Sequence, residues 1–228
     1  MKIIASLFIF IIFNTSLNAY SFPIPKENKA TYDIIRKNKV IGNLETEFIR
    51  NEKYLIINTK INIKVKVLFF PAYKFNQSSK EIWLDNEFIE FDGHTKFEDN
   101  REYYVKGKDS DSNFVASGMD GDLILDKNIL PLNYWNKDIL LEKEVFDTQK
   151  GIVRKISVQK LDDEILKINN QEIKTEKYLL DATTNPKDRG PFPQYTIWYD
   201  KKNELIKMKF TNWKDKKEIL TIRNNWDK

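Results

Sequence analysis

The clearest pattern in the sequence is a strict alternation of side chains from Ile57 to Val67. Odd positions carry Ile, Thr or Val, and even positions carry Asn or Lys. A period of two residues places the two sets on opposite faces of a β-strand. The segment therefore predicts a strand with one apolar and one polar face. Its register should be firmly set, because a shift of one residue would bury Lys60, Lys64 and Lys66.

Shorter alternating segments recur along the chain and are joined by short polar turns. Phe75–Leu84 and Phe88–Phe97, for example, flank Asp85-Asn86, a pair that tolerates the positive φ of tight hairpin turns. Asp162-Asp163 and Asn169-Asn170 are predicted as further turns. Connections this short favour an antiparallel meander over βαβ units, which need long crossovers. The remaining predicted strands are 32–36, 40–49, 101–107, 113–117, 153–159, 164–168, 173–180, 195–199, 205–210 and 218–223.

Two segments interrupt this rhythm. Pro131–Leu141, with Asn133 as a candidate N-cap, predicts one short helix near residues 132–141. Asp181–Pro193 contains three prolines and a glycine, and it predicts an irregular loop. Neither segment has the composition of a flexible linker between domains.

The predicted fold class is mainly β. About a dozen antiparallel strands in one sheet must curl, close or fold into two layers. We therefore expect a strongly curved antiparallel meander sheet, half-barrel or barrel-like, with the one short helix. The expected organisation is a signal peptide at residues 1–19, a lead-in segment at 20–28 and a single antiparallel β domain at 29–228.

The amino terminus has the pattern of a secretory signal peptide. Lys2 precedes an apolar run from Ile3 to Phe13, and Ala19 offers a small residue for cleavage before Tyr20. The run is shorter than the roughly 20 apolar residues that span a bilayer. We expect a cleaved chain in the periplasm or secreted, with no transmembrane span in its mature part. An uncleaved amino-terminal anchor is the alternative.

Composition removes several classes of function. The chain has no cysteine and one histidine, which excludes disulfides, thiol nucleophiles, cysteine-based zinc sites and multi-histidine metal centres. Charged residues make up 32% with a net charge of +4, and no block of five or more like charges occurs. Nucleic-acid binding needs basic residues concentrated on one face, so none is expected. No resident cofactor or metal is expected either.

The one histidine is the first catalytic candidate. His94, oriented by Asp92 or Asp99, could act as a general base in a hydrolase that uses this histidine or carboxylates. However, no nucleophile elbow is present, and on an alternating strand His94 points away from the face of Gly93 and Thr95. A surface histidine is the favoured interpretation.

A second candidate resembles the start of a calcium loop. Asp109, Asp111 and Asn113 have the right spacing, but Phe114 replaces the required glycine and Asp120 the bidentate glutamate. We favour a polar hairpin turn.

Aromatic side chains supply the third candidate, a site for an apolar ligand. Pro71 follows the alternating strand, cannot donate to a ladder and predicts a bend or bulge that exposes an edge. Such a bend could form a pocket mouth, or it could turn a sheet corner and pack inside. The aromatic residues of the chain that could line a ligand surface on the curved sheet are Phe69, Phe70, Tyr73, Trp83, Tyr134, Trp135 and Trp198.

Several blocks resemble a family of exported bacterial proteins, the DUF6134 proteins. The most specific are 68–73, Leu-Phe-Phe-Pro-Ala-Tyr, and 133–136, Asn-Tyr-Trp-Asn. Weaker ones are 32–34, Gly42, Trp83 and 197–199, in the same order along the chain. The resemblance implies export to the bacterial envelope and an antiparallel, β-rich fold, and it carries no activity or site residues.

Together these features predict an exported envelope protein, non-enzymatic rather than an enzyme, whose curved sheet binds an apolar ligand such as a lipid or acyl chain. The alternative is an accessory or structural module of the envelope that binds a protein through a sheet edge or the Phe69-Phe70 patch. The second alternative is the hydrolase. Fold alone does not decide among them.

Overall fold

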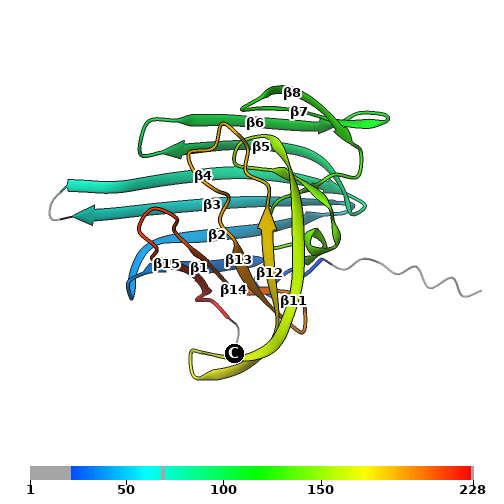
Figure 1. The fold of residues 1–228 in the computed structure, drawn as a ribbon. Coiled ribbons are helices and arrows are strands. Elements are labelled where there is room, and N and C mark those ends of the chain that lie inside the picture. Colours follow the sequence, from blue (N-terminus) through cyan, green and yellow to red (C-terminus); the bar gives the residue numbers. More distant parts are fainter. Residues whose placement is uncertain (1–21, 68–69, 227–228) are drawn as a thin grey trace, which may run out of the picture.

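The computed structural model describes residues 22–67 and 70–226, and within it the side chains of 66–72 are not described. Its strands form one fifteen-stranded sheet in the order β8-β7-β6-β5-β4-β3-β2-β1-β15-β14-β13-β12-β11-β10-β9 (Figure 1). The strands are β1 (Lys29–Arg36), β2 (Lys39–Asn51), β3 (Tyr54–Val67), β4 (Phe70–Leu84), β5 (Glu87–Phe97), β6 (Glu102–Asp109), β7 (Asn113–Gly118), β8 (Gly121–Asp126), β9 (Leu130–Pro131), β10 (Glu144–Asp147), β11 (Ile152–Ile168), β12 (Gln171–Ala182), β13 (Tyr195–Asp200), β14 (Leu205–Thr211) and β15 (Glu218–Arg223).

The predicted antiparallel meander is confirmed. Each strand from β1 to β8 pairs with the next, as do β10 to β15, and only the β9–β10 pair is parallel. The two runs are joined where β1 pairs antiparallel with β15. The sheet curves strongly, with β11 and β12 passing in front of β1 to β4 in Figure 1, but it does not close into a barrel. No helix in the described part of the chain has the length and apolar character to cross a membrane.

Strand β3 has the two faces that its alternation predicts. Leu55 and Ile57 are buried, whereas Lys60 and Lys64 are exposed. The Lys66 side chain lies outside the described residues. The bulge predicted at Pro71 is confirmed by the β3–β4 ladder, which pairs Lys66 with Pro71 but Val65 with Tyr73.

Tight turns of asparagine and aspartate join the hairpins as expected. Asp85 and Asn86 have φ of 49° and 72°, and Asn169 and Asn170 have 50° and 63°. Both central residues of a type I′ turn need positive φ, and Asn and Asp adopt it more readily than other residues with a side chain. The turns thus set the registers of β4–β5 and β11–β12.

The turn predicted at Asp162-Asp163 is wrong. β11 runs without a break from Ile152 to Ile168, and the two aspartates form an irregularity where the β11–β12 register shifts between Leu161 and Glu164. Both side chains are exposed, so they can be looped out of the ladder without burying a charge. Beyond this bulge, the β11–β12 hairpin buries the opposite face of its strands.

The predicted short helix near residues 132–141 is also corrected. The segment contains a 3-10 helix, η1 (Lys137–Leu141), whose N-cap is Asn136 and not Asn133. Asn136 accepts the N–H of Asp138, while Asn133 Oδ1 accepts the N–H of Asn136 one turn earlier. Pro131 and the buried Leu132 hold the first half extended, so only the last five residues can coil.

The inner face of the sheet is covered by residues 127–143, which join β8 to β10 and are called the linking segment below. Trp135 of this segment packs edge-on against Trp83 and Phe48 of the inner face, with ring centroids 5.7 and 5.6 Å apart. Ile129 and Ile139 are buried in the same core. Phe22, in the predicted lead-in, also packs on Trp83 and Trp135. Burying such rings supplies most of the apolar stabilisation of the core.

The irregular loop predicted at residues 181–193 occupies 183–194. It is held by the buried Arg154, whose guanidinium donates to Asp188 at 3.0 Å and to the Thr183 carbonyl oxygen at 2.7 Å. The same guanidinium donates to Asp147 of β10 at 2.6 Å. One arginine thus ties β11, β10 and the loop together.

The two runs of strands also touch near Gly118, the last residue of β7. The Met119 N–H donates to the Lys150 carbonyl oxygen at 2.6 Å, between the β7–β8 and β10–β11 turns. A Cβ on Gly118 would lie 2.5 Å from both the Lys150 oxygen and the Gly151 Cα. Only glycine fits where these two backbones meet.

Gly118→Ala should therefore destabilise the protein by about 2 kcal/mol, because the added carbon meets backbone atoms that must move. The free energy of unfolding from urea titration measures the effect, with Ser117→Ala as the neighbouring control. A loss below about 0.5 kcal/mol would show that the two turns separate freely.

Candidate functional site

Trp83 and Trp135, two of the predicted ligand-binding residues, lie together at the centre of the core. Trp83 is 1% exposed and Trp135 is 6% exposed. Phe88 packs on Trp83 from β5 with ring centroids 5.2 Å apart, and Phe22 packs on both tryptophans. The position that an apolar ligand would take beside these two rings is filled by the protein's own side chains.

A buried carboxylate, Glu81, organises this centre. It accepts hydrogen bonds from Trp83 Nε1 at 3.1 Å, Asn133 Nδ2 at 2.9 Å and Trp135 Nε1 at 3.3 Å. Burial raises the pKa of Glu81 to about 7, although the three N–H donors act in the opposite direction. Glu81 thus bonds the linking segment to β4, and its site favours the neutral acid.

The other predicted residues lie elsewhere. Tyr134 is partly buried and packs on Tyr195, with ring centroids 5.1 Å apart. Tyr73 is partly buried near the β3–β4 turn, and burial raises its pKa to about 12. The side chains of Phe69 and Phe70 lie outside the described residues.

Trp198 belongs to a separate cluster. It packs with Leu166, Ile173 and Ile206, beyond the bulge of β11, and its Nε1 donates to Glu164 at 3.1 Å. Lys207 lies over its ring at 4.4 Å. The predicted aromatic residues therefore do not form one surface: Trp83 and Trp135 meet, and Trp198 packs apart from them.

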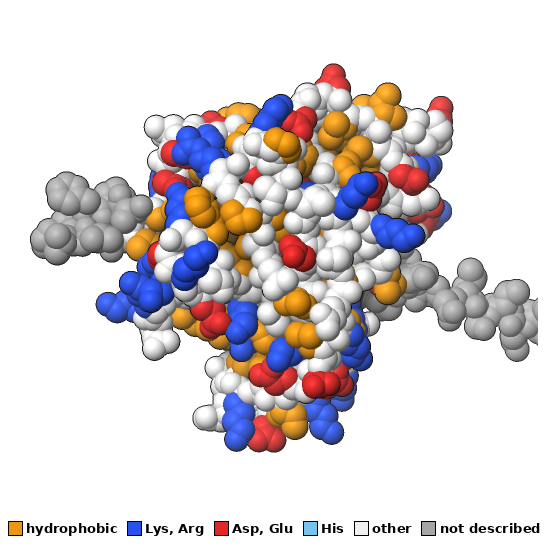
Figure 2. Space-filling view, in the orientation of Figure 1, with side chains coloured by type: hydrophobic (Ala, Val, Ile, Leu, Met, Phe, Trp, Pro, Cys, Tyr) orange, Lys and Arg blue, Asp and Glu red, His pale blue; other side chains and the backbone are white. Residues whose placement is uncertain are grey.

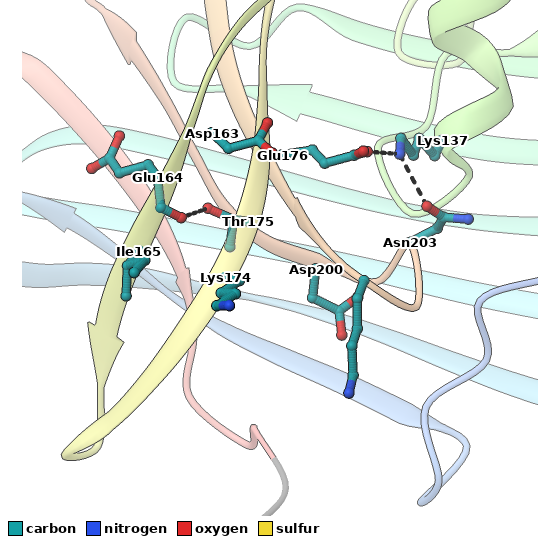
Figure 3. Close-up of a pocket in the computed structure, with 10 residues that line it drawn as sticks. Lys137, Asp163, Glu164, Ile165, Lys174, Thr175, Glu176, Asp200 and Asn203 are labelled. Atoms are coloured by element: carbon teal, nitrogen blue, oxygen red, sulfur yellow. Dashed lines mark hydrogen bonds and ion pairs between the residues drawn. The ribbon is translucent and has the colours of Figure 1, made fainter.

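A polar cleft of about 400 Å³ opens between the β11–β12 hairpin, η1 and the turn after β13 (Figure 3). On one side Lys137 donates to the Glu176 carboxylate and to Asn203 Oδ1, the latter at 3.0 Å. On the other, Thr175 Oγ1 donates to the Glu164 carbonyl oxygen at 2.6 Å. The cleft is lined by Lys137, Asp163, Glu164, Ile165, Lys174, Thr175, Glu176, Asp200, Lys201 and Asn203.

Two of the carboxylates that line this cleft, Glu176 and Asp200, are engaged in hydrogen bonds. The hydrogen bond from Lys137 is the main cause that lowers the pKa of Glu176 to about 2, so this carboxylate is a poor proton donor or acceptor near neutral pH. The carboxylate of Asp200 accepts the N–H groups of Lys202 and Glu204 and thereby fixes its own turn. These interactions do not favour acid–base chemistry by Glu176 or Asp200.

His94 lies on the outer face of β5, as its position predicts, whereas Gly93 and Thr95 are buried on the inner face. Its ring stacks on Tyr104 with centroids 4.5 Å apart and 6° between planes. Its Nε2 has no hydrogen-bond partner among the described residues.

Asp99, one of the two carboxylates suggested to orient His94, is engaged elsewhere. Asp99 accepts from Arg101 at 2.9 Å and also bonds Arg189. Asp92 is exposed, and Glu102, which accepts from Tyr104 Oη at 3.2 Å, lies with its Oε2 3.8 Å from His94 Nε2.

The calcium-like segment forms the hairpin turn between β6 and β7, as favoured from the sequence. Ser110 N–H donates to the Asn113 carbonyl oxygen at 2.8 Å, and Asp111 is exposed. Within residues 22–67 and 70–226, no group of three or more acidic or histidine side chains is arranged to hold a metal ion.

On the face shown in Figure 2, hydrophobic side chains occur in small groups between charged ones. Among the most exposed large apolar residues is Ile124 of β8, at 77%. Its cross-strand neighbour on β7 is Val115, which is 45% exposed. This apolar pair lies at the end of the sheet, because β8 is its outermost strand.

Sequence reasoning missed Glu81 and β8. The alternation of Phe75–Leu84 does place Glu81 on the face of Trp83, so the strand period contained that signal. Strand β8 (Gly121–Asp126) was not among the strands predicted from the sequence. The cleft had no local signal, because its lining comes from four separate segments.

Comparison with known proteins agrees with the fold. Residues 32–218 match the model of a family described as a domain of unknown function, DUF6134. No curated protein matches the sequence significantly. Among solved structures, the fold is similar to the crystal structure of a beta-barrel-like protein of the domain of unknown function DUF1849 from Brucella abortus. The TM-score is 0.58 at 12% identity, over 86% of this chain and 94% of that chain.

Proposed function

The chain belongs to the DUF6134 family, and we propose that it is an exported envelope protein that works by binding another protein on its outer surface. The observation that carries the proposal is the contrast between its two faces. The inner face is filled by the linking segment around Trp83 and Trp135, while Ile124 and Val115 remain exposed at an outer edge. Exposed apolar groups beside a strand edge that has no neighbour among the described residues favour recognition of a partner.

The arrangement of the titratable groups supports binding over catalysis. Glu81 is enclosed by N–H donors, Glu176 is paired with Lys137, and His94 is stacked on Tyr104. A general acid or base must reach the substrate and change its protonation near the working pH. Glu81 lacks access, and Glu176 is held in its charged form by Lys137.

Photo-crosslinking in the cells that make the protein tests the proposal. A photoreactive side chain is placed in turn at the exposed positions Tyr104, Ile124 and Leu141, and adducts are separated by mass. We expect a discrete protein adduct from at least one position. If all three yield only the uncrosslinked chain, the protein-binding function is wrong.

Export is the second part of the proposal, and the apolar run of residues 3–13 supports it. We expect the protein isolated from the envelope fraction to begin at Tyr20, which amino-terminal sequencing or intact mass measures. A chain that retains Met1 and stays in the cytoplasm would contradict export.

An apolar ligand remains the second candidate, favoured by the inner face near the β3–β4 turn. There Ile61, Ile63, Val65 and Tyr73 are only partly buried, in contrast to Leu55 and Ile57 at the other end of β3. We expect lipid extracted from the purified mature chain to be far below one molecule per chain by mass spectrometry. An equimolar amount of one lipid would favour this candidate over protein binding.

A further inference from the structure

The outermost strand of the sheet, β8, has two different faces. Leu123 and Leu125 pack against the core, while Asp122, Ile124 and Asp126 are exposed. Among the described residues β8 pairs with β7 alone, and it forms the upper edge of the sheet in Figure 1.

The backbone of β8 offers hydrogen-bonding groups at this edge. In an antiparallel ladder, alternate residues turn their N–H and C=O groups toward the neighbour and away from it. The Asp126 carbonyl oxygen accepts the N–H of Ile129, outside the ladder, at 3.0 Å. Asp126 therefore belongs to the set that faces away from β7, and Ile124 and Asp122, two and four residues earlier, belong to it as well.

The free stretch is short and bounded. At its start Asp120 accepts from Lys187 at 2.6 Å and from Asn185 at 3.1 Å, so the loop after β12 holds the turn. At its end the Asp126 carboxylate accepts the N–H of Asn128 at 2.8 Å. The edge available for pairing is thus centred on Ile124.

We propose that the β8 edge binds an extended segment of another protein whose outward side chains alternate basic, apolar, basic. This deepens the protein-binding function proposed above and rests on it. An added strand would place its apolar residue beside Ile124 and its two basic residues beside Asp122 and Asp126, because same-face residues repeat every second position. Main-chain pairing supplies the binding and the charges select the partner.

The same charges disfavour a second copy of this chain. Antiparallel pairing of two β8 strands centred on Ile124 sets Asp122 of one copy opposite Asp126 of the other. Like charges placed directly opposite destabilise a strand pair. The lysines on this face at positions 106 and 108 belong to β6, two strands away, so they do not neutralise the edge.

The test uses the mature chain and two labelled peptides, Thr-Lys-Thr-Ile-Thr-Lys-Thr and the same peptide with Glu for Lys. Fluorescence anisotropy should show the lysine peptide binding at least about ten-fold more tightly, since two charge pairs change sign between the peptides. In Asp122→Lys we expect the preference to fall about three-fold or more. Equal binding of both peptides, or an unchanged preference in Asp122→Lys, would overturn the proposal.

Three variants locate the site. Ile124→Pro removes the outward N–H, which an edge strand tolerates, and should abolish binding of the lysine peptide. Ile124→Ser keeps the backbone and should weaken binding several-fold through loss of the apolar contact. Leu141→Lys changes an exposed apolar residue elsewhere and should have no effect; loss of binding there, or full binding in both Ile124 variants, contradicts the assignment.

Failure of this inference is separable from failure of the proposed function. If Leu141 or Tyr104 crosslinks to a protein but the peptides do not bind, the chain binds proteins by another surface and the β8 proposal is wrong. If crosslinks are absent at all three positions, both are wrong.

Discussion

Replacing Glu81 with glutamine should stabilise the protein progressively as the pH rises. We expect the difference in the free energy of unfolding between Glu81→Gln and the wild type to grow by about 3 kcal/mol from pH 4.5 to pH 8. This size follows from the displacement of the Glu81 pKa from 4.5 to about 7, which is caused by burial.

The direction follows from which state binds the proton more tightly. Below pH 4.5 the carboxyl is protonated in both the folded and unfolded states, so the burial penalty is absent. Between 4.5 and 7 the unfolded chain releases the proton while the folded chain retains it, so the stability of the wild type falls as the pH rises. Glutamine does not titrate and can still accept from Trp83 and Asn133, so the variant avoids this loss.

Urea titrations of both proteins at several pH values measure the effect. Glu87→Gln is the matched control, because Glu87 is exposed on the next strand, and it should change stability by less than about 0.5 kcal/mol at either pH. A constant difference between Glu81→Gln and the wild type across the range would show that Glu81 is charged in the fold at no cost.

Replacing Arg154 with methionine is the second large change, with an expected loss of about 3 kcal/mol. Methionine fills similar volume, but Asp147 and Asp188 then lose their buried guanidinium partner. Removing one member of a buried ion pair leaves a charge that the protein interior does not compensate. Asp188 retains Lys150, so most of the loss should come from Asp147.

A double-mutant comparison separates the causes. Asp147→Asn in the Arg154→Met background should recover part of the stability, because it removes the orphaned charge. Lys155→Met, at the exposed neighbouring position, should be close to neutral. If Arg154→Met costs less than about 1 kcal/mol, the guanidinium is not what holds the loop of residues 183–194.

The fold was largely predictable because alternation is a local signal. Strand β3 and the Asp85-Asn86 turn follow from residues that are adjacent in the sequence. Asp162 and Asp163 misled for the same reason: a polar pair signals a turn locally, but pairing with β12 on both sides keeps β11 continuous. At this position, and in the segment predicted as a short helix, tertiary contacts outweighed the local conformational preference of the sequence.

The candidate site was much less predictable. Trp83 and Trp135 are 52 residues apart, and their contact depends on how the linking segment returns to the inner face. Nothing local distinguishes them from Trp198, whose burial depends on the bulge in β11. The sequence can indicate that an aromatic residue on a strand will be buried. Which residues it contacts in the fold depends on the topology.

The pairing of β1 with β15 determines when the sheet can be completed. Strand β1 can pair with β15 only after the residues from 218 onward have been synthesised. Until then, within residues 29–211, the edges of β1 and β14 that pair with β15 remain unpaired. Contacts this distant along a chain slow folding and leave strand edges prone to aggregation. A chain stopped before β15 should therefore accumulate as aggregates.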